Sequence, residues 1–186
     1  MRRALRRRRR ALPPRRRREA ALAVARHGAA WPWLRRCAHV AAYWPADGEL
    51  EPWPLLERLP GLRVLYLPVV RPGGKLWFAP YGPGAACAAN RYGIPEPLAP
   101  AVPVRVLDVV LLPLVAFDGQ GHRLGMGGGY YDRTLAFLRH RRRRRRPRLV
   151  GLAYAFQEVA ALPAEPWDVP LDAVITEQGL RLFPGP

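Results

Sequence analysis

The chain has 186 residues and a hydrophobic content of 49%, which is enough for one domain with a sizeable core. Its formal charge of +17 at pH 7 would indicate a nucleic-acid-binding protein if the charge were spread over the whole chain. The longest apolar run covers only residues 109–117, well short of the ~20 residues of a membrane-spanning helix, so such a helix is excluded.

Two tracts carry the positive charge. Eleven arginines lie in residues 1–18 and eight more in residues 139–148, which leaves 12 of the 31 basic residues for the remainder, against all 14 acidic ones. Because Lys75 is the only lysine, we interpret the tracts mainly as a bias towards arginine. We expect a single domain, 1–186, with an arginine-rich helix at 1–18 and a solvated arginine-rich loop at 139–148. A nucleic-acid-binding protein that uses these tracts is the alternative.

The predicted elements begin with two helices, at residues 1–12 and about 15–27, separated by Pro13-Pro14. A strand at 39–43 and a turn through Asp47-Gly48 lead to a short helix at 52–59, which begins at a proline. An apolar strand at 63–70 completes a β-α-β unit, for which a parallel sheet is expected. Residues 76–78 are a candidate edge strand, and 149–154 are a further strand.

The cysteines and histidines show no metal-binding pattern. Cys37 and Cys87 lie fifty positions apart and form no C-x-x-C pair, so we expect free thiols in a reducing compartment. The four histidines lack the spacing of metal ligands, and His122 is expected in a solvent-facing turn.

The centre of the chain joins an apolar run, residues 109–117, to a glycine-rich segment, Gly125–Gly129, and then to a helical tail at 134–140. Glycines allow positive φ and bring backbone N–H groups close to an anion, so a strand, a glycine-rich turn and a helix start are typical of a phosphate site. The spacing matches neither common nucleotide motif, since Tyr130 stands where G-x-G-x-x-G needs its third glycine. From the residues alone, a phosphate loop and an ordinary strand-to-helix connection both remain open.

Three longer segments resemble the 5-formyltetrahydrofolate cyclo-ligases, also called 5,10-methenyltetrahydrofolate synthetases. They are PLVAFDGQGHRLGMGGGYYDR at 113–133, GIPEP at 93–97 and LPAEPWDVPLDAVIT at 162–176. The first matches every fixed position of the family's P-x-x-A-F-D-x-x-G-x-R-L-G-x-G-x-G-Y-Y-D-R. The resemblance implies a three-layer α/β/α fold with a mostly parallel sheet, of the NagB/RpiA/CoA-transferase-like type, which the alternation of strands and helices also favours. The glycine loop would then lie at the carboxyl ends of the strands.

The resemblance implies ATP-dependent cyclisation of 5-formyltetrahydrofolate to 5,10-methenyltetrahydrofolate, with release of ADP and phosphate. ATP is then the co-substrate, Mg²⁺ the cofactor and a reduced folate the substrate. We expect a monomer in the cytoplasm with no membrane partner, although the arginine-rich start also resembles an organelle transit peptide. A relative acting on another formylated or amine substrate is an alternative, because the nucleotide half is matched better than the folate half.

The same resemblance assigns site residues, and it makes Arg123 and Tyr130 the candidate catalytic residues. Nucleotide contacts are expected from Arg2, Arg6, Arg123, Gly125, Met126, Gly127, Gly128, Gly129, Tyr130 and Tyr131. Folate contacts are expected from Glu49, Tyr92, Met126, Gly128 and Tyr130. Asp132 and Asp168 would hold Mg²⁺, which suits an ion that takes few protein oxygens. Where the family usually continues with Asp-Thr, this chain has Glu51-Pro52, so the contacts just after Glu49 are left open.

Overall fold

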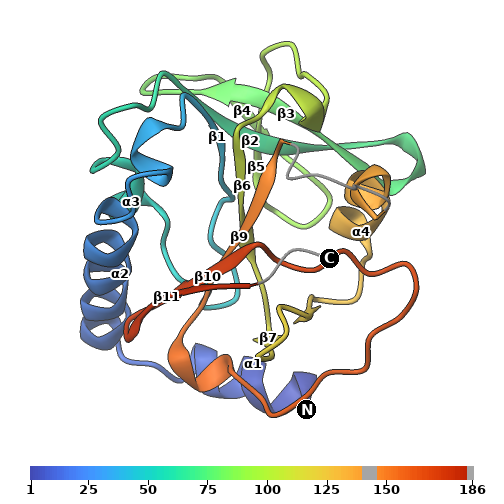
Figure 1. Ribbon diagram of the computed structural model, residues 1–186. Coiled ribbons are helices and arrows are strands. Elements are labelled where there is room, and N and C mark those ends of the chain that lie inside the picture. The colour runs from blue at the N-terminus through green and yellow to red at the C-terminus, as the bar shows by residue number, and fades with distance from the viewer. Residues whose placement is uncertain (140–145, 184–186) are drawn as a thin grey trace.

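The computed structural model describes residues 1–139 and 146–183, and in them a seven-stranded sheet forms the middle of the molecule (Figure 1). The strand order is β11-β10-β9-β6-β1-β2-β3. The strands are β1 (His39–Ala41), β2 (Val64–Arg71), β3 (Lys75–Tyr81), β6 (Val109–Pro113), β9 (Arg148–Leu152), β10 (Ala173–Thr176) and β11 (Gly179–Leu182). The five inner strands are parallel, whereas β3 and β11 pair antiparallel at the two edges.

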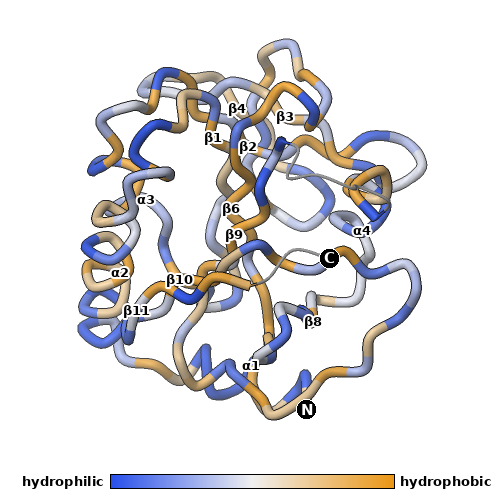
Figure 2. Tube along the Cα trace, viewed as in Figure 1, coloured by the Kyte–Doolittle hydropathy of each residue, from blue (hydrophilic) through white to orange (hydrophobic). Residues whose placement is uncertain are grey.

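Both faces of the inner strands are apolar because both are covered. In β6, Val109 and Leu111 belong to one buried cluster, and Val110 and Leu112 to the other. The same alternation continues in β10, where Val174 lies on the face opposite its two neighbours. Figure 2 shows the central strands as mostly hydrophobic and α1 (Arg2–Arg10) as mostly hydrophilic.

Helices cover the two faces separately (Figure 1). α2 (Pro14–Ala29) and α3 (Trp53–Leu56) pack on one side, and α4 (Tyr130–Leu135), continued by the 3-10 turn Ala136–Leu138, packs on the other. α2 approaches α3 so closely at Gly28 that a Cβ there would lie 2.5 Å from a Leu55 methyl carbon. This arrangement confirms the expected α/β fold with a mostly parallel sheet between two helical layers.

The sequence predicted a single strand for the central apolar run, residues 109–117, and this prediction is wrong. β6 ends at Pro113, and β7 (Ala116–Phe117) instead forms a separate hairpin with β8 (Arg123–Leu124). The glycine segment therefore follows β8 and not the central strand itself. The helix after it begins at Tyr130, four residues earlier than predicted, so the Tyr-Tyr-Asp sequence lies in its first turn.

Other predicted elements are present with altered bounds. The predicted helix at 52–59 is reduced to α3, and the candidate edge strand at 76–78 is the longer β3. The hairpin of β4 (Cys87–Ala89) and β5 (Pro95–Pro97), and the strands β10 and β11, were not predicted. Both cysteines are free, as expected. His140 and most of the predicted loop at 139–148 lie outside the described residues.

The sheet has a topological switch point between β1 and β6. The chain leaves β1 to form β2 on one side and later returns to form β6 on the other. In open α/β sheets, ligands bind beyond the carboxyl ends of the strands at such a point. The segments that leave these ends here are residues 42–52 and residues 114–129, which contain Glu49 and the glycine loop.

Candidate active site

The glycine loop, Gly125–Gly129, is an exposed segment between β8 and α4. Gly127 has φ of +100° and Gly129 has φ of +64°, and L side chains rarely adopt such backbone conformations. Gly128 is constrained differently, because a Cβ there would lie 2.9 Å from the Tyr130 ring. The loop thus depends on glycine both for its conformation and for the close approach of Tyr130.

Of the three arginines predicted to contact the nucleotide, Arg2 lies at the glycine loop. Its Nε donates a hydrogen bond to the Gly125 carbonyl at 2.9 Å, and its guanidinium lies next to Gly127. Arg6, one helical turn further along α1, instead pairs with Asp47 at 2.8 Å. α1 therefore contacts both segments at the switch point.

Arg9 is a functional candidate that sequence reasoning missed. Its side chain is only 1% exposed, and its Nε and Nη2 donate to the backbone carbonyl and the carboxylate of Asp47. Nη1 donates to the Leu114 carbonyl, Nη2 lies 3.7 Å from Glu49, and Met126 sulfur lies 3.9 Å away. Arg9 thus joins the segments after β1 and β6 to the glycine loop. Its spacing of three from Arg6 was the available signal, but seven arginines in ten residues conceal it.

Glu49 lies beneath this arginine, with its side chain only 10% exposed. Burial raises the pKa of Glu49, which Arg9 and a hydrogen bond from the Ala46 N–H partly oppose. Burial also raises the pKa of the neighbouring Tyr131, and the Glu49 charge raises it further. Asp47 differs: burial would raise its pKa, but hydrogen bonds from Arg6 and Arg9 lower it overall.

Tyr92 and Tyr130, both predicted to contact the folate, lie together. Their hydroxyl groups are 2.7 Å apart, and their rings meet edge to face with centroids 6.2 Å apart. Arg91 donates to the Tyr130 hydroxyl and lies over the Tyr92 ring, and Arg133 lies over the Tyr130 ring. The hydrogen bonds from Tyr92 and then Arg91 lower the pKa of Tyr130. Because Tyr92 is 56% exposed, an aromatic surface remains open to a flat ligand.

Arg123 contacts one of the two predicted magnesium ligands and the backbone next to the other. Its guanidinium pairs with Asp132 in α4 and donates to the Val169 carbonyl, next to Asp168. The Asp168 carboxylate accepts the Glu165 N–H at 3.0 Å. Within the described residues there is no group of three or more His, Cys, Asp and Glu side chains that could hold a metal. Two carboxylates nevertheless suit Mg²⁺, which usually completes its shell with substrate phosphates and water.

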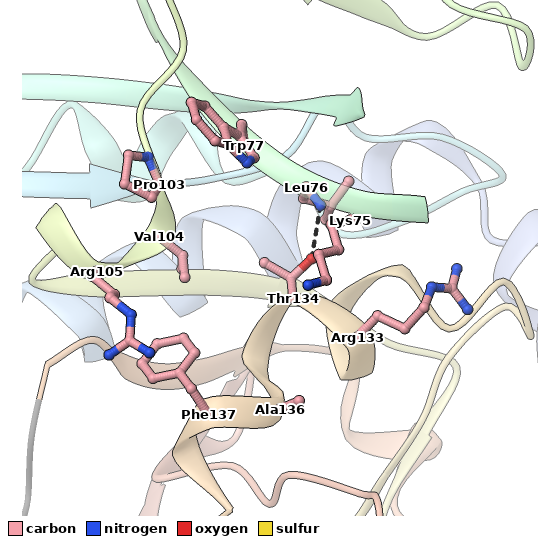
Figure 3. A pocket seen from close by; sticks show the side chains of 10 residues that line it. All are labelled: Lys75, Leu76, Trp77, Pro103, Val104, Arg105, Arg133, Thr134, Ala136 and Phe137. Atoms are coloured by element: carbon pink, nitrogen blue, oxygen red, sulfur yellow. Dashed lines mark hydrogen bonds between the residues drawn. The ribbon is translucent and has the colours of Figure 1, made fainter. Parts of the chain in front are cut away.

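Two cavities lie beside this site, and neither contains the glycine loop. Figure 3 shows the first, of about 250 Å³, where Thr134 accepts the Leu76 N–H at 2.7 Å and the Arg105 guanidinium covers the Phe137 ring. It is lined by Lys75, Leu76, Trp77, Pro103, Val104, Arg105, Arg133, Thr134, Ala136 and Phe137. The second, of about 390 Å³, is lined by Val70, Arg71, Pro72, Gly73, Gly74, Asn90, Arg91 and Glu96.

These features define a class of protein: an α/β protein with a glycine loop and converging arginines at the switch point of a parallel sheet, as in enzymes that bind anionic ligands. The chain belongs to the 5-formyltetrahydrofolate cyclo-ligase family, whose sequence model matches residues 1–177. The resemblance found in the sequence is thereby confirmed.

Named relatives and solved structures agree. The 5-formyltetrahydrofolate cyclo-ligase of Escherichia coli K12 is 46% identical over 144 residues, 74% of this chain and 76% of the relative. That of Haemophilus influenzae is 42% identical over 143 residues, 74% of each chain. The 5,10-methenyltetrahydrofolate synthetase of Aquifex aeolicus superposes with a TM-score of 0.83 at 32% identity, covering 100% of this chain and 92% of that one. The 5,10-methenyltetrahydrofolate synthetase of Mycoplasma pneumoniae superposes with a TM-score of 0.72 at 25% identity, covering 95% of this chain and 96% of that one.

In the part of the chain that the structure describes, no helix is both long and apolar enough to cross a membrane.

Proposed function

We propose that this protein catalyses the ATP-dependent cyclisation of 5-formyltetrahydrofolate to 5,10-methenyltetrahydrofolate, with release of ADP and phosphate. Family membership supports the reaction, and one observation supports its location. A glycine loop contacted by Arg2 lies next to the Tyr92–Tyr130 pair, so a polyphosphate and a flat heterocycle can bind side by side. The proposed reaction requires that proximity, because the phosphoryl group must reach the formyl oxygen.

The chemistry needs activation of an oxygen that leaves poorly. The formyl oxygen attacks the γ-phosphorus of ATP, the bond from that phosphorus to the bridging oxygen breaks, and ADP leaves. The nitrogen at position 10 then attacks the activated formyl carbon and loses its proton to solvent. Phosphate departs with the former formyl oxygen and takes up a proton in exchange. The protein's contribution is mainly positioning and charge stabilisation, as in other phosphoryl transfers.

The nucleotide half of the site consists of the glycine loop and the arginines around it. Backbone N–H groups of residues 125–129 would bind the phosphates, with Met126, Tyr130 and Tyr131 beside them. Arg2, Arg6 and Arg123 would neutralise their charge, Arg6 while also paired with Asp47. Mg²⁺ bound by Asp132 and Asp168 would neutralise charge on the transferred phosphoryl group.

The folate half would use Glu49, Tyr92, Tyr130, Met126 and the surface at Gly128. A buried carboxylate such as Glu49 accepts hydrogen bonds from the N–H groups of a pterin ring, and Tyr92 offers an exposed ring face for stacking. Tyr130 contacts both halves, because it follows the glycine loop and its hydroxyl pairs with Tyr92. We assign Arg123 and Tyr130 the roles closest to the reacting groups.

The test is absorbance in the ultraviolet band of the methenyl product, with purified protein and 5-formyltetrahydrofolate. We expect the band to grow only when ATP and Mg²⁺ are both present. Growth without ATP would contradict the activation step, and growth in a chelator would contradict the metal. ATP binding without product would favour a relative with another formylated or amine substrate.

A further inference from the structure

The cavity of about 390 Å³ beside the tyrosine pair has no role in the proposed cyclisation site. Its walls are the end of β2, the turn Pro72–Gly74 and the hairpin of β4 and β5. Two of its lining residues, Arg71 and Arg91, are exposed arginines. Each guanidinium lies over an aromatic ring. The distance from the guanidinium carbon to the ring centroid is 5.3 Å for Arg71 and Trp77 and 4.9 Å for Arg91 and Tyr92.

The charged side chains that line this cavity are two arginines and one glutamate, so its net formal charge is positive. Glu96 is its acidic lining residue, and one Glu96 oxygen already accepts the Val70 N–H at 3.1 Å and the Asn90 amide at 2.8 Å. Among residues 1–139 and 146–183, the ion pairs include no carboxylate partner for Arg71 or Arg91. The two guanidinium groups are therefore available to an anionic ligand.

The cavity adjoins both halves of the proposed site. Arg91 lies over the Tyr92 ring and also donates to the Tyr130 hydroxyl, so it belongs to the cavity and to the tyrosine pair alike. Arg133 donates to the Gly74 carbonyl in the cavity wall at 3.0 Å and to the Gly128 carbonyl in the glycine loop at 2.6 Å. A ligand with a ring against Tyr92 can therefore extend directly into the cavity.

We propose that this cavity binds the glutamyl tail of the reduced folate, and that Arg71 and Arg91 receive its carboxylates. The inference rests on the proposed function. The two co-substrates bring two separate groups of negative charge: the ATP phosphates, assigned to the glycine loop and Arg2, and the tail carboxylates beyond the folate rings. Arg71 and Arg91 line the cavity beside the tyrosine pair, and guanidinium groups bind carboxylates with two parallel hydrogen bonds.

The test compares two substrates in wild-type protein and in Arg71→Gln. One is 5-formyltetrahydrofolate with its single glutamate, and the other is 5-formyltetrahydropteroate, which lacks it. We expect Arg71→Gln to raise KM for 5-formyltetrahydrofolate about three- to ten-fold, the range for a partly exposed charge pair. KM for 5-formyltetrahydropteroate and KM for ATP should change less than about two-fold. Arg71→Lys should recover part of the loss.

Arg105→Gln is the matched control, because it removes another exposed arginine that lies over an aromatic ring, in the other cavity (Figure 3). It should leave all three KM values unchanged. Equal increases for the two folates would overturn the tail assignment, as would an increase in KM for ATP or the same effect from Arg105→Gln. Wild-type protein that forms no product from either folate would refute the proposed function itself, and the tail site with it.

Discussion

Arg9 shows how one buried charge can hold the site together. It is 1% exposed and satisfies groups on the segments after β1 and β6, yet within the sequence it is one arginine among many. A buried cation is stable only when its donors are used. Removal of Arg9 leaves the buried Glu49 carboxylate without its ion pair, although Arg6 still pairs with Asp47.

Arg9→Met should therefore destabilise the protein by about 3–5 kcal/mol, since it leaves Asp47 and Glu49 without their buried partner. Urea-induced unfolding measures the change. Arg10→Met is the matched control, because Arg10 also approaches Asp47, at 3.4 Å, but its side chain is 57% exposed. It should change stability by no more than about 1 kcal/mol. Similar losses in the two variants would contradict the bridging role of Arg9.

Glu49 should set the acid limit of folate binding. Burial raises the pKa of Glu49, so its protonated form persists to higher pH than in an ordinary glutamate. As pH falls through this raised pKa, the carboxylate loses its charge and its full capacity to accept hydrogen bonds, and kcat/KM for the folate should fall. The groups facing Glu49 are Arg9, Arg6, Asp47, Tyr43 and Tyr131.

The pH profile of Arg9→Met tests this assignment. Arg9 favours the charged form of Glu49, so its removal should move the acid limb of kcat/KM to higher pH. Glu49→Gln cannot titrate at this position and should lose that limb while keeping a low, flatter activity. An unchanged limb in both variants would assign the titration to another group.

At the scale of elements, the glycine loop depends on backbone conformation more than on packing. Gly127 has φ of +100°, and a Cβ there would meet only the Arg2 guanidinium, at 3.7 Å. Gly127→Ala should thus introduce about 1–2 kcal/mol of strain, because the alanine is forced to positive φ, and the loop should move to relieve this strain. We expect KM for ATP to rise about ten-fold or more, as measured by steady-state kinetics, because the backbone donors would no longer converge.

Gly119→Ala is the matched control for this loop. Gly119 lies in the turn between β7 and β8, shows no positive φ, and would have no atom within 4 Å of an added Cβ. It should leave KM for ATP unchanged and be neutral in stability. If Gly127→Ala behaved like Gly119→Ala, the loop would not bind the phosphates through its backbone.

Much of this element structure could be predicted, and the failures have physical causes. The apolar run at 109–117 predicted a buried strand, but the pattern could not show that the chain leaves the sheet at Pro113. β4 consists of Cys87, Ala88 and Ala89, whose small side chains give no alternating pattern, and its pairing with β5 depends on residues from Asn90 to Ile94. Local sequence located the glycine loop and the two tyrosines. Arg9 required the fold, since its partners are 38 and 105 positions away.

At the scale of the whole molecule, the two arginine tracts differ in how far the structure describes them. In the first tract, Arg2, Arg6 and Arg9 contact the glycine loop, Asp47 and Glu49, so part of its charge belongs to the site. This use of the tract weakens the alternative of a protein that binds nucleic acid as its main function. For the second tract, residues 141–145 lie outside the described residues, and we propose only non-specific nucleic-acid contact.

Replacing Arg141–Arg145 with serines should therefore separate the two activities. We expect kcat/KM for the cyclisation to stay within about two-fold, because the proposed site does not use these residues. Affinity for a random-sequence oligonucleotide should fall markedly at low salt, since salt-dependent contact with a polyanion needs only charge density. Arg2→Ala should show the reverse pattern, a large loss of ATP-dependent turnover with nearly unchanged oligonucleotide affinity. If the serine variant lost the cyclisation as well, the second tract would be part of the enzyme and not an accessory to it.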